Sequence, residues 1–279
     1  MRLKIFAVVV CLVACKPRVS RLDGVDSPGF LPEQTASACQ PAPFGEATMF
    51  AVFITGSARL DDSTVEGRFA AGGDVRLTKT LIGGALPEDP ERFDLIGGGR
   101  VTLIGSEVAK GGIVHAGELQ VQSPKQSSKQ PGPVVAGAPL DFSAATQDIK
   151  SLADRLARAK DLPDGTFRRV GMVATDLQPQ KASAVTIAPN SSVVVLVPGK
   201  EMRLDNPSVN LIGAAGERTI LFFSEAEAVY LGPTTINATV FAPSAVVTID
   251  GTTITGQVIA AGVTGRGQIV GQLFAGCTP

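Results

Sequence analysis

A repeat of eighteen residues near the C-terminus constrains the fold of this chain more than any other feature. Ten residues beginning at Thr235 (TINATVFAPS) align without gaps with ten beginning at Thr253 (TITGQVIAAG). A third copy, one residue shorter, occupies residues 65–72 (VEGRFAAG). Self-similarity at about twenty residues is typical of a solenoid, in which each repeat forms one turn of the chain.

Each copy also has the alternation of a β-strand. Apolar and polar positions alternate, and Ala with Gly or Pro follows where the chain must turn tightly. Further short β-rich runs, separated by glycine or proline, occupy residues 50–55, 75–77, 101–104, 193–197, 220–223 and 246–249. Stacked turns of this kind would bury ladders of Val, Ile and Phe in a narrow core. A β-sandwich with similar strands is the alternative that the repeat leaves open.

One segment, residues 141–160, has helical periodicity instead. Its apolar side chains recur at spacings of three and four, which places them on one stripe of a helix. They are Phe142, Ala145, Ile149, Leu152, Leu156 and Ala159. Asp141 is the expected N-cap, and the charged opposite face predicts a helix lying along the outside of the solenoid. The predicted fold is mostly β: a β-helix (β-solenoid) with one long α-helix packed alongside.

The N-terminus has the organisation of an export signal. A short basic region at residues 1–4 precedes the apolar residues 5–14, too few for the roughly 20 that span a bilayer. Residues 12–15 (LVAC) resemble the lipobox of bacterial lipoproteins, in which cleavage before the cysteine exposes it for acylation. An ordinary signal with an incidental cysteine at Cys15 is the alternative. Lys16 follows instead of the Asp that typically retains lipoproteins in an inner membrane, which favours the outer membrane or cell surface.

These features predict three segments. Residues 1–14 are a lipoprotein signal peptide, and residues 15–46 are a lipid-anchored flexible tether with Pro, Ser and Gly but no periodic apolar pattern. Residues 47–279 are one β-solenoid domain that includes the helix at 141–160. The polar stretch 122–133 is expected to be a surface loop.

The four cysteines acquire different roles if the chain is exported. Cys11 is lost with the signal and Cys15 is lipidated, which leaves Cys39 and Cys277. Two remaining cysteines in an exported chain suggest a disulfide. A metal site is not expected, because the chain has one histidine and neither remaining cysteine belongs to a C-x-x-C pair.

Composition argues against several classes of function. The formal net charge is −1, so nucleic acid is not expected as a partner. The chain has no Trp and a single Tyr, which weakens the case for a carbohydrate-binding module built on aromatic platforms. No segment matches a cofactor-binding motif, and no cofactor is expected.

No catalytic residue is expected either. The only histidine, His115, is interpreted as a strand or turn residue, because no activated nucleophile accompanies it. Asp61, Asp62, Glu66 and Asp74 lie close together in the sequence. We interpret them as solvated turn charges in preference to a glycosidase pair or a weak calcium site.

The repeat residues also carry a family resemblance. Residues 50–56 (FAVFITG) and 65–75 (VEGRFAAGGDV) resemble the opening of the choice-of-anchor A domain, a family of adhesins. The resemblance continues in order through residues 140–145, 220–226, 240–246, 256–261, 265–269 and 274–276, so it spans residues 47–276. The order of strands, helix and solenoid is more distantly similar to that of bacterial ice-binding solenoids, and this likeness implies that the predicted β-helix is a right-handed β-helix (β-solenoid).

The resemblance implies a non-enzymatic cell-surface lipoprotein that acts as an adhesin or surface binding module. Its expected partners are the membrane, through the anchor at Cys15, and an extracellular matrix protein or surface glycan; the ligand-binding residues stay unknown. The alternatives are a passive structural protein of the envelope or matrix, an ice-binding protein and a polysaccharide-active β-helix enzyme. Ice binding would need a flat array of threonines, and residues 252–255 (TTIT) are expected to be a solvated strand.

Overall fold

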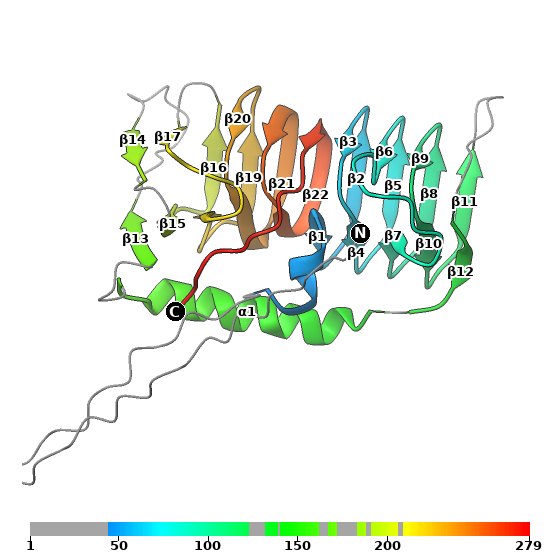
Figure 1. Ribbon diagram of the computed structural model, residues 1–279, viewed down its shortest axis with the longest axis horizontal. Helices are drawn as coiled ribbons and strands as arrows, with labels where there is room; N and C mark the ends of the chain where they lie inside the picture. Colours follow the sequence, from blue (N-terminus) through cyan, green and yellow to red (C-terminus); the bar gives the residue numbers. More distant parts are fainter. Residues whose placement is uncertain are drawn as a thin grey trace, which may run out of the picture. The chain divides into compact units, whose positions relative to one another are not determined.

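Parallel strand pairing organises the part of the chain that the computed structural model describes. This part comprises residues 44–122, 132–138, 140–161, 167–171, 183–187, 191–205 and 209–279, all within one unit, residues 36–279. Three ladders of parallel strands run along a β-solenoid, and we name them the helix face, the open face and the third face (Figure 1).

The helix face is the ladder against which the only α-helix of the described residues packs. In stacking order it consists of β12 (Val134–Ala136), β10 (Gly112–His115), β7 (Phe93–Gly97), β4 (Phe69–Ala71), β1 (Val52–Ile54), the first part of β22 (Val258–Ile269), the first part of β21 (Thr239–Ile254), β18 (Thr219–Phe222), β15 (Ser192–Leu196) and β13 (Phe167–Gly171).

The other two ladders share the long strands β21 and β22, which turn two corners and contribute to every face. The open face consists of β11 (Leu119–Gln122), β8 (Val101–Ile104), β5 (Val75–Thr78), β2 (Ala58–Asp61), the middle of β22 and β21, β19 (Ala228–Leu231) and β16 (Glu201–Leu204). The third face consists of β9 (Glu107–Val108), β6 (Leu81–Ile82), β3 (Thr64–Val65), the ends of β22 and β21, and β20 (Thr235–Ile236). Strands β14 (Ser183–Thr186) and β17 (Val209–Ile212) pair with each other.

The order of the coils in space differs from their order in the chain. Strand β1 pairs with β4 on one side and with β22 on the other, so the first coil lies against the last. From this seam the coils of residues 52–122 extend in one direction. Helix α1 (Phe142–Arg158) then runs back along the stack, and the coils of residues 167–269 return from the far end to the seam (Figure 1).

The strand register confirms the repeat on which the fold prediction depends. Thr235 pairs with Thr253 and Val240 with Val258, which is the offset of eighteen residues. The shorter third copy takes the equivalent place beyond the seam, because Val52 pairs with Val258 on one side and with Phe69 on the other. All six predicted strand segments lie on observed strands or extend them by one or two residues.

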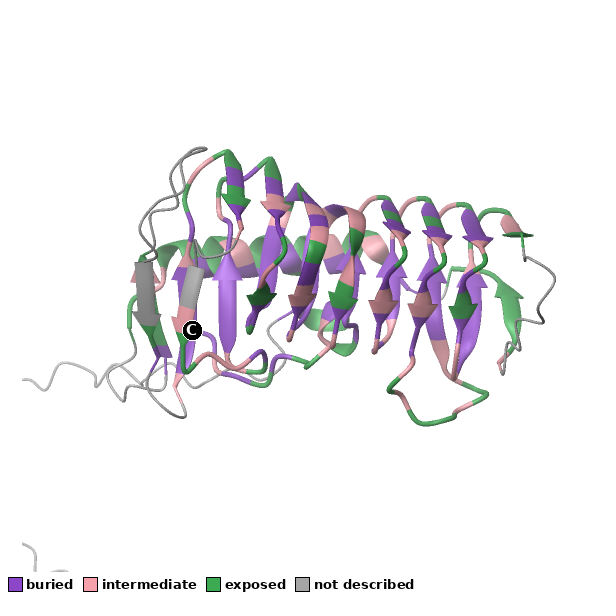
Figure 2. Cartoon of the chain, turned by 90° about the horizontal axis from the view of Figure 1, so that it is seen from above, coloured by how far each residue is buried: buried purple, intermediate pink, exposed green. Residues whose placement is uncertain are grey.

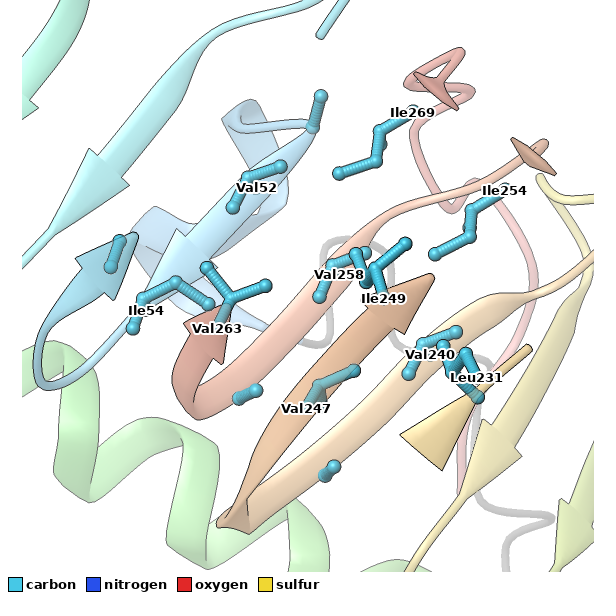
Figure 3. Close-up of a cluster of buried hydrophobic side chains, with 14 of the residues drawn as sticks. Val52, Ile54, Leu231, Val240, Val247, Ile249, Ile254, Val258, Val263 and Ile269 are labelled. Atoms are coloured by element: carbon cyan, nitrogen blue, oxygen red, sulfur yellow. The ribbon is translucent and has the colours of Figure 1, made fainter. Parts of the chain in front are cut away.

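The interior of the solenoid is a narrow aliphatic core. Side chains from β1, β19, β21 and β22 point toward one another there, among them Val52, Val247 and Ile254 (Figure 3). Alternation along each strand places every second side chain inside, as the buried–exposed pattern of β2 and β5 shows.

A second, aromatic core lies between the helix face and α1. The buried side chains of α1 are Ala145, Ile149, Leu152 and Leu156, which confirms the predicted stripe. Asp141 is the N-cap, and its Oδ1 accepts hydrogen bonds from the backbone N–H groups of Ser143 and Ala144, both at 3.0 Å. In Figure 2 the exposed residues of the helix lie on the side away from the strands. No helix among the described residues is long and apolar enough to cross a membrane.

The packed structure extends at least three residues before the predicted domain start at residue 47. Phe44, assigned above to the tether, is fully buried, with its ring centroid 5.3 Å from that of Phe241 and 5.8 Å from that of Phe274. A 3₁₀-helix, η1 (Gly45–Met49), follows it directly. A single phenylalanine in a polar stretch gives no periodic signal, so sequence periodicity places the boundary too late.

Corners packed with glycine let successive coils approach closely. Between the helix face and the open face, the backbone N–H of Gly73 donates to Gly56 O at 2.7 Å, and that of Gly99 donates to Gly73 O at 3.0 Å. A Cβ on Gly99 would lie 2.9 Å from the backbone of Gly73. Side chains are therefore excluded from this corner.

The helix stripe generates the first prediction. Leu152→Ala should lower the free energy of unfolding by about 2–4 kcal/mol, because Leu152 is fully buried between α1 and the helix face. Lys150→Ala, on the exposed side of the same helix, should change it by less than about 0.5 kcal/mol. Chemical denaturation followed by circular dichroism measures both. Equal losses would show that the stripe does not dock the helix.

Candidate ligand-binding face

A continuous row of outward side chains runs along the middle of the open face. Strand register places each one beside the next: Arg203, Tyr230, Thr248, Thr264, Arg59, Arg76, Thr102 and Gln120. All of them carry hydrogen-bonding groups, and the three arginines are exposed. The row crosses the seam between β22 and β2 without interruption, so both halves of the solenoid contribute to one surface.

A second row borders the first where each strand of the open face begins. In the N-terminal half it consists of the residues that directly follow the corner glycines, including Ser57, Asp74 and Arg100. Hydrogen bonds from backbone N–H groups to side-chain oxygens hold this row in place. The N–H of Arg100 donates to Asp74 Oδ1 at 2.8 Å, and the N–H of Asp74 donates to Ser57 Oγ at 3.2 Å. In the C-terminal half the corresponding positions are Glu201 and Ala228.

Two depressions lie between these rows. The larger, about 430 Å³, is lined by Ser57, Ala58, Arg59, Asp74, Val75, Arg76, Arg100, Thr102 and Val263. The smaller, about 230 Å³, is lined by Glu201, Met202, Arg203, Ala228, Val229, Tyr230 and Thr248. Four strand spacings separate Tyr230 from Arg76, or about 19 Å at roughly 4.8 Å per strand. One extended ligand lying along the row could therefore reach both.

Charged groups around the smaller depression form a connected network. The Tyr230 hydroxyl donates to Asp250 Oδ2 at 2.8 Å, and Arg266 Nε donates to Asp250 Oδ1 at 3.1 Å. Arg203 lies over the Tyr230 ring, 4.2 Å from its centroid, and its Nε donates to Asp205 Oδ2 at 2.8 Å. One face of the only tyrosine is thus covered by a guanidinium group.

These contacts shift the pKa values of the network. The hydrogen bond from Tyr230, followed by that from Arg266, holds the pKa of Asp250 below its ordinary value. The same bond to Asp250 raises the pKa of Tyr230, and the bond to Asp205 raises that of Arg203. Arg203 and Asp250 are therefore charged at neutral pH, and the Tyr230 hydroxyl is neutral.

The threonine tract does not form an extended array. Thr252 is buried, and its hydroxyl donates to the carbonyl oxygens of Leu231 at 2.8 Å and Gly232 at 2.6 Å. The prediction that residues 252–255 form a solvated strand is therefore wrong for Thr252. Thr253 lies on the third face beside Thr235, but the next position in that row is Gln268. The buried hydroxyl of Thr252 satisfies carbonyls at a corner of the coil, whereas the sequence prediction treated the whole tract as solvated.

The other sequence-predicted polar residues engage separate partners in the structure. His115 ends β10, and its Nδ1 lies 2.6 Å from Gly117 O. Asp61 forms an ion pair with Arg59 at 3.4 Å, and Glu66 accepts a hydrogen bond from Gln268 at 3.0 Å. No group of three or more His, Cys, Asp or Glu residues that could hold a metal ion occurs within the described ranges.

Of the cysteines with a predicted role, only Cys277 lies within the described residues. Cys277 is disulfide-bonded, and its backbone N–H donates to Ser192 Oγ at 2.6 Å. Cys15 and Cys39 lie outside the described residues, so lipidation of Cys15 and the Cys39–Cys277 pairing stay predictions.

Sequence reasoning missed the open face as a candidate site. Arg59, Arg76, Arg203 and Tyr230 are far apart in the chain and look individually like ordinary solvated positions. A signal was present, because the dipeptide Arg-Leu recurs at residues 59–60, 76–77 and 203–204, each time within an alternating strand. Only the register shows that the three arginines share one row.

The sequence belongs to the family described as "Putative Ice-binding-like adhesive domain", which it matches over residues 43–270. This confirms the expected adhesive family with its more distant likeness to ice-binding solenoids. No curated protein matches the chain.

Similar solved structures include three ice-binding proteins. That of the Antarctic ascomycete Antarctomyces psychrotrophicus is 11% identical, with a TM-score of 0.41, covering 82% of this chain and 97% of the other. A domain of an ice-binding protein of Shewanella frigidimarina is 13% identical, with a TM-score of 0.41, covering 84% and 98%. One from an Antarctic biological consortium is 17% identical, with a TM-score of 0.39, covering 87% and 96%. These likenesses carry no conclusion about function.

The tyrosine network generates the second prediction. Tyr230→Phe removes the largest cause of the lowered pKa of Asp250, so that pKa should rise toward the ordinary value of 3.8. A lowered carboxyl pKa contributes stability that is lost as the pH falls through it, so the variant should lose this contribution at a higher pH. NMR titration of the side-chain carboxyl carbon measures the pKa. Thr248→Val, beside Tyr230 in the row, is the control, and an unchanged pKa in Tyr230→Phe would contradict the assignment.

Proposed function

We propose that this protein is a non-enzymatic binding module of the cell surface that holds its ligand on the open face. The observation that carries the proposal is the uninterrupted middle row, with two depressions beside it in the same register. Membership in an adhesive family supports surface binding. An extracellular matrix protein or a surface glycan is the proposed class of ligand.

The arrangement of the three faces favours the open face as the binding surface. The helix face is covered by α1 and the aromatic core. The third face has strands of two residues in β3, β6 and β9, which leave a narrow ladder. The open face is wider, and its exposed arginines can exchange hydrogen bonds with water for bonds to a ligand.

A non-enzymatic role fits the chemistry of the described residues. Nδ1 of the only histidine is already engaged by a backbone carbonyl. The carboxylates of Asp61, Asp74 and Asp250 are engaged by Arg59, the Arg100 backbone, and Tyr230 with Arg266. Hydrogen bonds and ion pairs thus hold these side chains in fixed positions on the surface. None of these carboxylates is paired with another as acid and nucleophile.

The proposed location is the outer membrane or cell surface. A signal peptide at residues 1–14 and acylation of Cys15 would attach the chain to the membrane, and residues 15–43 would connect that anchor to the packed domain at Phe44. The only partner proposed at this end of the chain is the lipid bilayer.

Ice binding is the alternative favoured by specific residues. Thr248 and Thr264 are neighbours on the open face, as are Thr235 and Thr253 on the third face. A regular array would have to continue, but Tyr230 and Arg59 flank the open-face pair. The aromatic ring of Tyr230 and the long cationic side chain of Arg59 at those positions disrupt a flat hydroxyl surface.

The anchor gives the third prediction. Cys15→Ser removes the acylated thiol, so the full-length chain should move from the detergent phase to the aqueous phase in phase partitioning. Cys11→Ser, within the proposed signal, should partition like the wild type. Detergent partitioning of the Cys15→Ser chain equal to that of the wild type would exclude the lipid anchor.

The fourth prediction tests the binding face directly. Thr264→Trp fills the middle of the open face, whereas Thr253→Trp makes the same change on the third face. The full-length chain is tested against immobilised matrix proteins, glycans and ice. For whichever ligand the wild type retains, Thr264→Trp should reduce affinity at least about tenfold, or about 1.4 kcal/mol, and Thr253→Trp should not.

Three outcomes separate the candidate functions. Equal effects of the two tryptophans on a retained ligand would overturn the open face as the site. Retention on ice alone would favour the ice-binding alternative. Retention on none of the surfaces would favour a passive structural role. Circular dichroism confirms that both variants fold.

A further inference from the structure

One arginine of the middle row lacks the counterion that its counterparts have. The sequence Arg-Leu-Asp occurs within β2 and again at the end of β16, where the aspartate directly follows the strand. In each case the arginine pairs with the aspartate two residues on: Arg59 with Asp61 at 3.4 Å, and Arg203 with Asp205 at 2.8 Å. Strand β5 carries Arg76-Leu-Thr78 at the same register. Arg76 forms no ion pair or hydrogen bond with any described residue.

The surroundings of Arg76 concentrate positive charge. Its direct cross-strand neighbour is Arg59, and like charges placed opposite each other on neighbouring strands repel. Arg100 lines the same depression, and its only ion pair with a described residue is with Glu118 at 3.5 Å, where both side chains are more than half exposed. Such a pair is weak. An anion in the depression would relieve the repulsion.

The depression can accept such an anion. Its volume of about 430 Å³ lies within the range of small-ligand sites, roughly 300–1,000 Å³. Three guanidinium groups and the hydroxyls of Ser57 and Thr102 line it, against a single carboxylate, that of Asp74. Asp74 Oδ1 is already occupied by the Arg100 backbone N–H. The planar guanidinium fork matches the paired oxygens of a carboxylate or sulfate.

On the basis of the function proposed above, we propose that the arginine depression of Arg59, Arg76 and Arg100 binds the anionic groups of an acidic polysaccharide. Carboxylate and sulfate groups share the required chemistry. The row continues from the depression past Thr264 and Thr248 to Tyr230, so further sugar residues can lie along polar side chains. The hydroxyls of this stretch suit the neutral positions of a glycan chain.

Charge distribution favours a glycan over other polyanions. Asp61, Asp74 and Glu118 lie beside the three arginines and limit the positive charge to the depression itself. The chain as a whole has a net charge of −1. Nucleic acid and anionic bilayers are bound by broad positive surfaces. The only tyrosine is covered on one face by Arg203, which removes a stacking surface for bases.

The test compares two ways of removing the free charge. Arg76→Gln deletes the cation, and Thr78→Asp completes the Arg-Leu-Asp sequence of β5 so that Arg76 acquires a counterion. Arg155→Gln, on the exposed side of α1, and Thr78→Asn are the matched controls. Affinity of the full-length chain in nonionic detergent is measured by calorimetry for polygalacturonate, dextran sulfate, neutral dextran and duplex DNA.

We expect binding to polygalacturonate or dextran sulfate that weakens with salt, and no binding to dextran. Arg76→Gln and Thr78→Asp should each reduce that affinity about tenfold or more, and both controls should retain it. Comparing the two polyanions decides between carboxylate and sulfate. Thermal unfolding verifies that Thr78→Asp remains folded.

Several results would overturn the proposal. These are no binding to either polysaccharide, equal binding to DNA, or full affinity in both Arg76→Gln and Thr78→Asp. If a different ligand is retained and Thr264→Trp blocks it while Arg76→Gln does not, the acidic-polysaccharide inference fails and the binding face stands. If Thr264→Trp blocks no retained ligand, the proposed function itself fails.

Discussion

The pairing of β1 with β22 is the constraint on which the rest of the structure depends. It joins the first coil to the last, with Val52 against Val258 and Ile54 against Ala260. Gln257 reinforces this seam from a fully buried position. Its Nε2 donates to the Phe50 carbonyl at 2.6 Å, and its Oε1 accepts from the Phe274 N–H at 2.9 Å. Two terminal segments and the last coil are therefore held by one side chain whose polar groups are all satisfied.

The seam also explains why the chain needs a helix. Coils that extend from β1 in one direction leave the chain at the far end of the stack, and the C-terminal coils must begin at the opposite end. Helix α1 covers that distance with local hydrogen bonds alone and buries its apolar stripe on the way. The contacts that close the seam join residues far apart in sequence, so we expect them to form after the two halves.

Sequence periodicity could predict the coils because each is a local pattern. The eighteen-residue offset, the strand at residues 246–249 and the stripe of α1 all follow from spacing within a short window. The seam could not be predicted, because the alternation around Val52 is satisfied equally well by any neighbouring coil. The arginine row was missed for a related reason. Arg76 and Arg203 come to lie on one surface only because strands pair across the seam.

The central position of the entry strand has a mechanical consequence for a tethered domain. In a solenoid that starts at one end, a pull on the N-terminus would peel off one coil at a time. Here β1 is bonded on both sides, to β4 and β22, and Phe44 is buried beneath the helix just before it. We expect a load transmitted through Phe44 to be shared in shear between these two strand pairings, which would let a domain tethered as proposed above resist forces that detach an anchored cell from its surface.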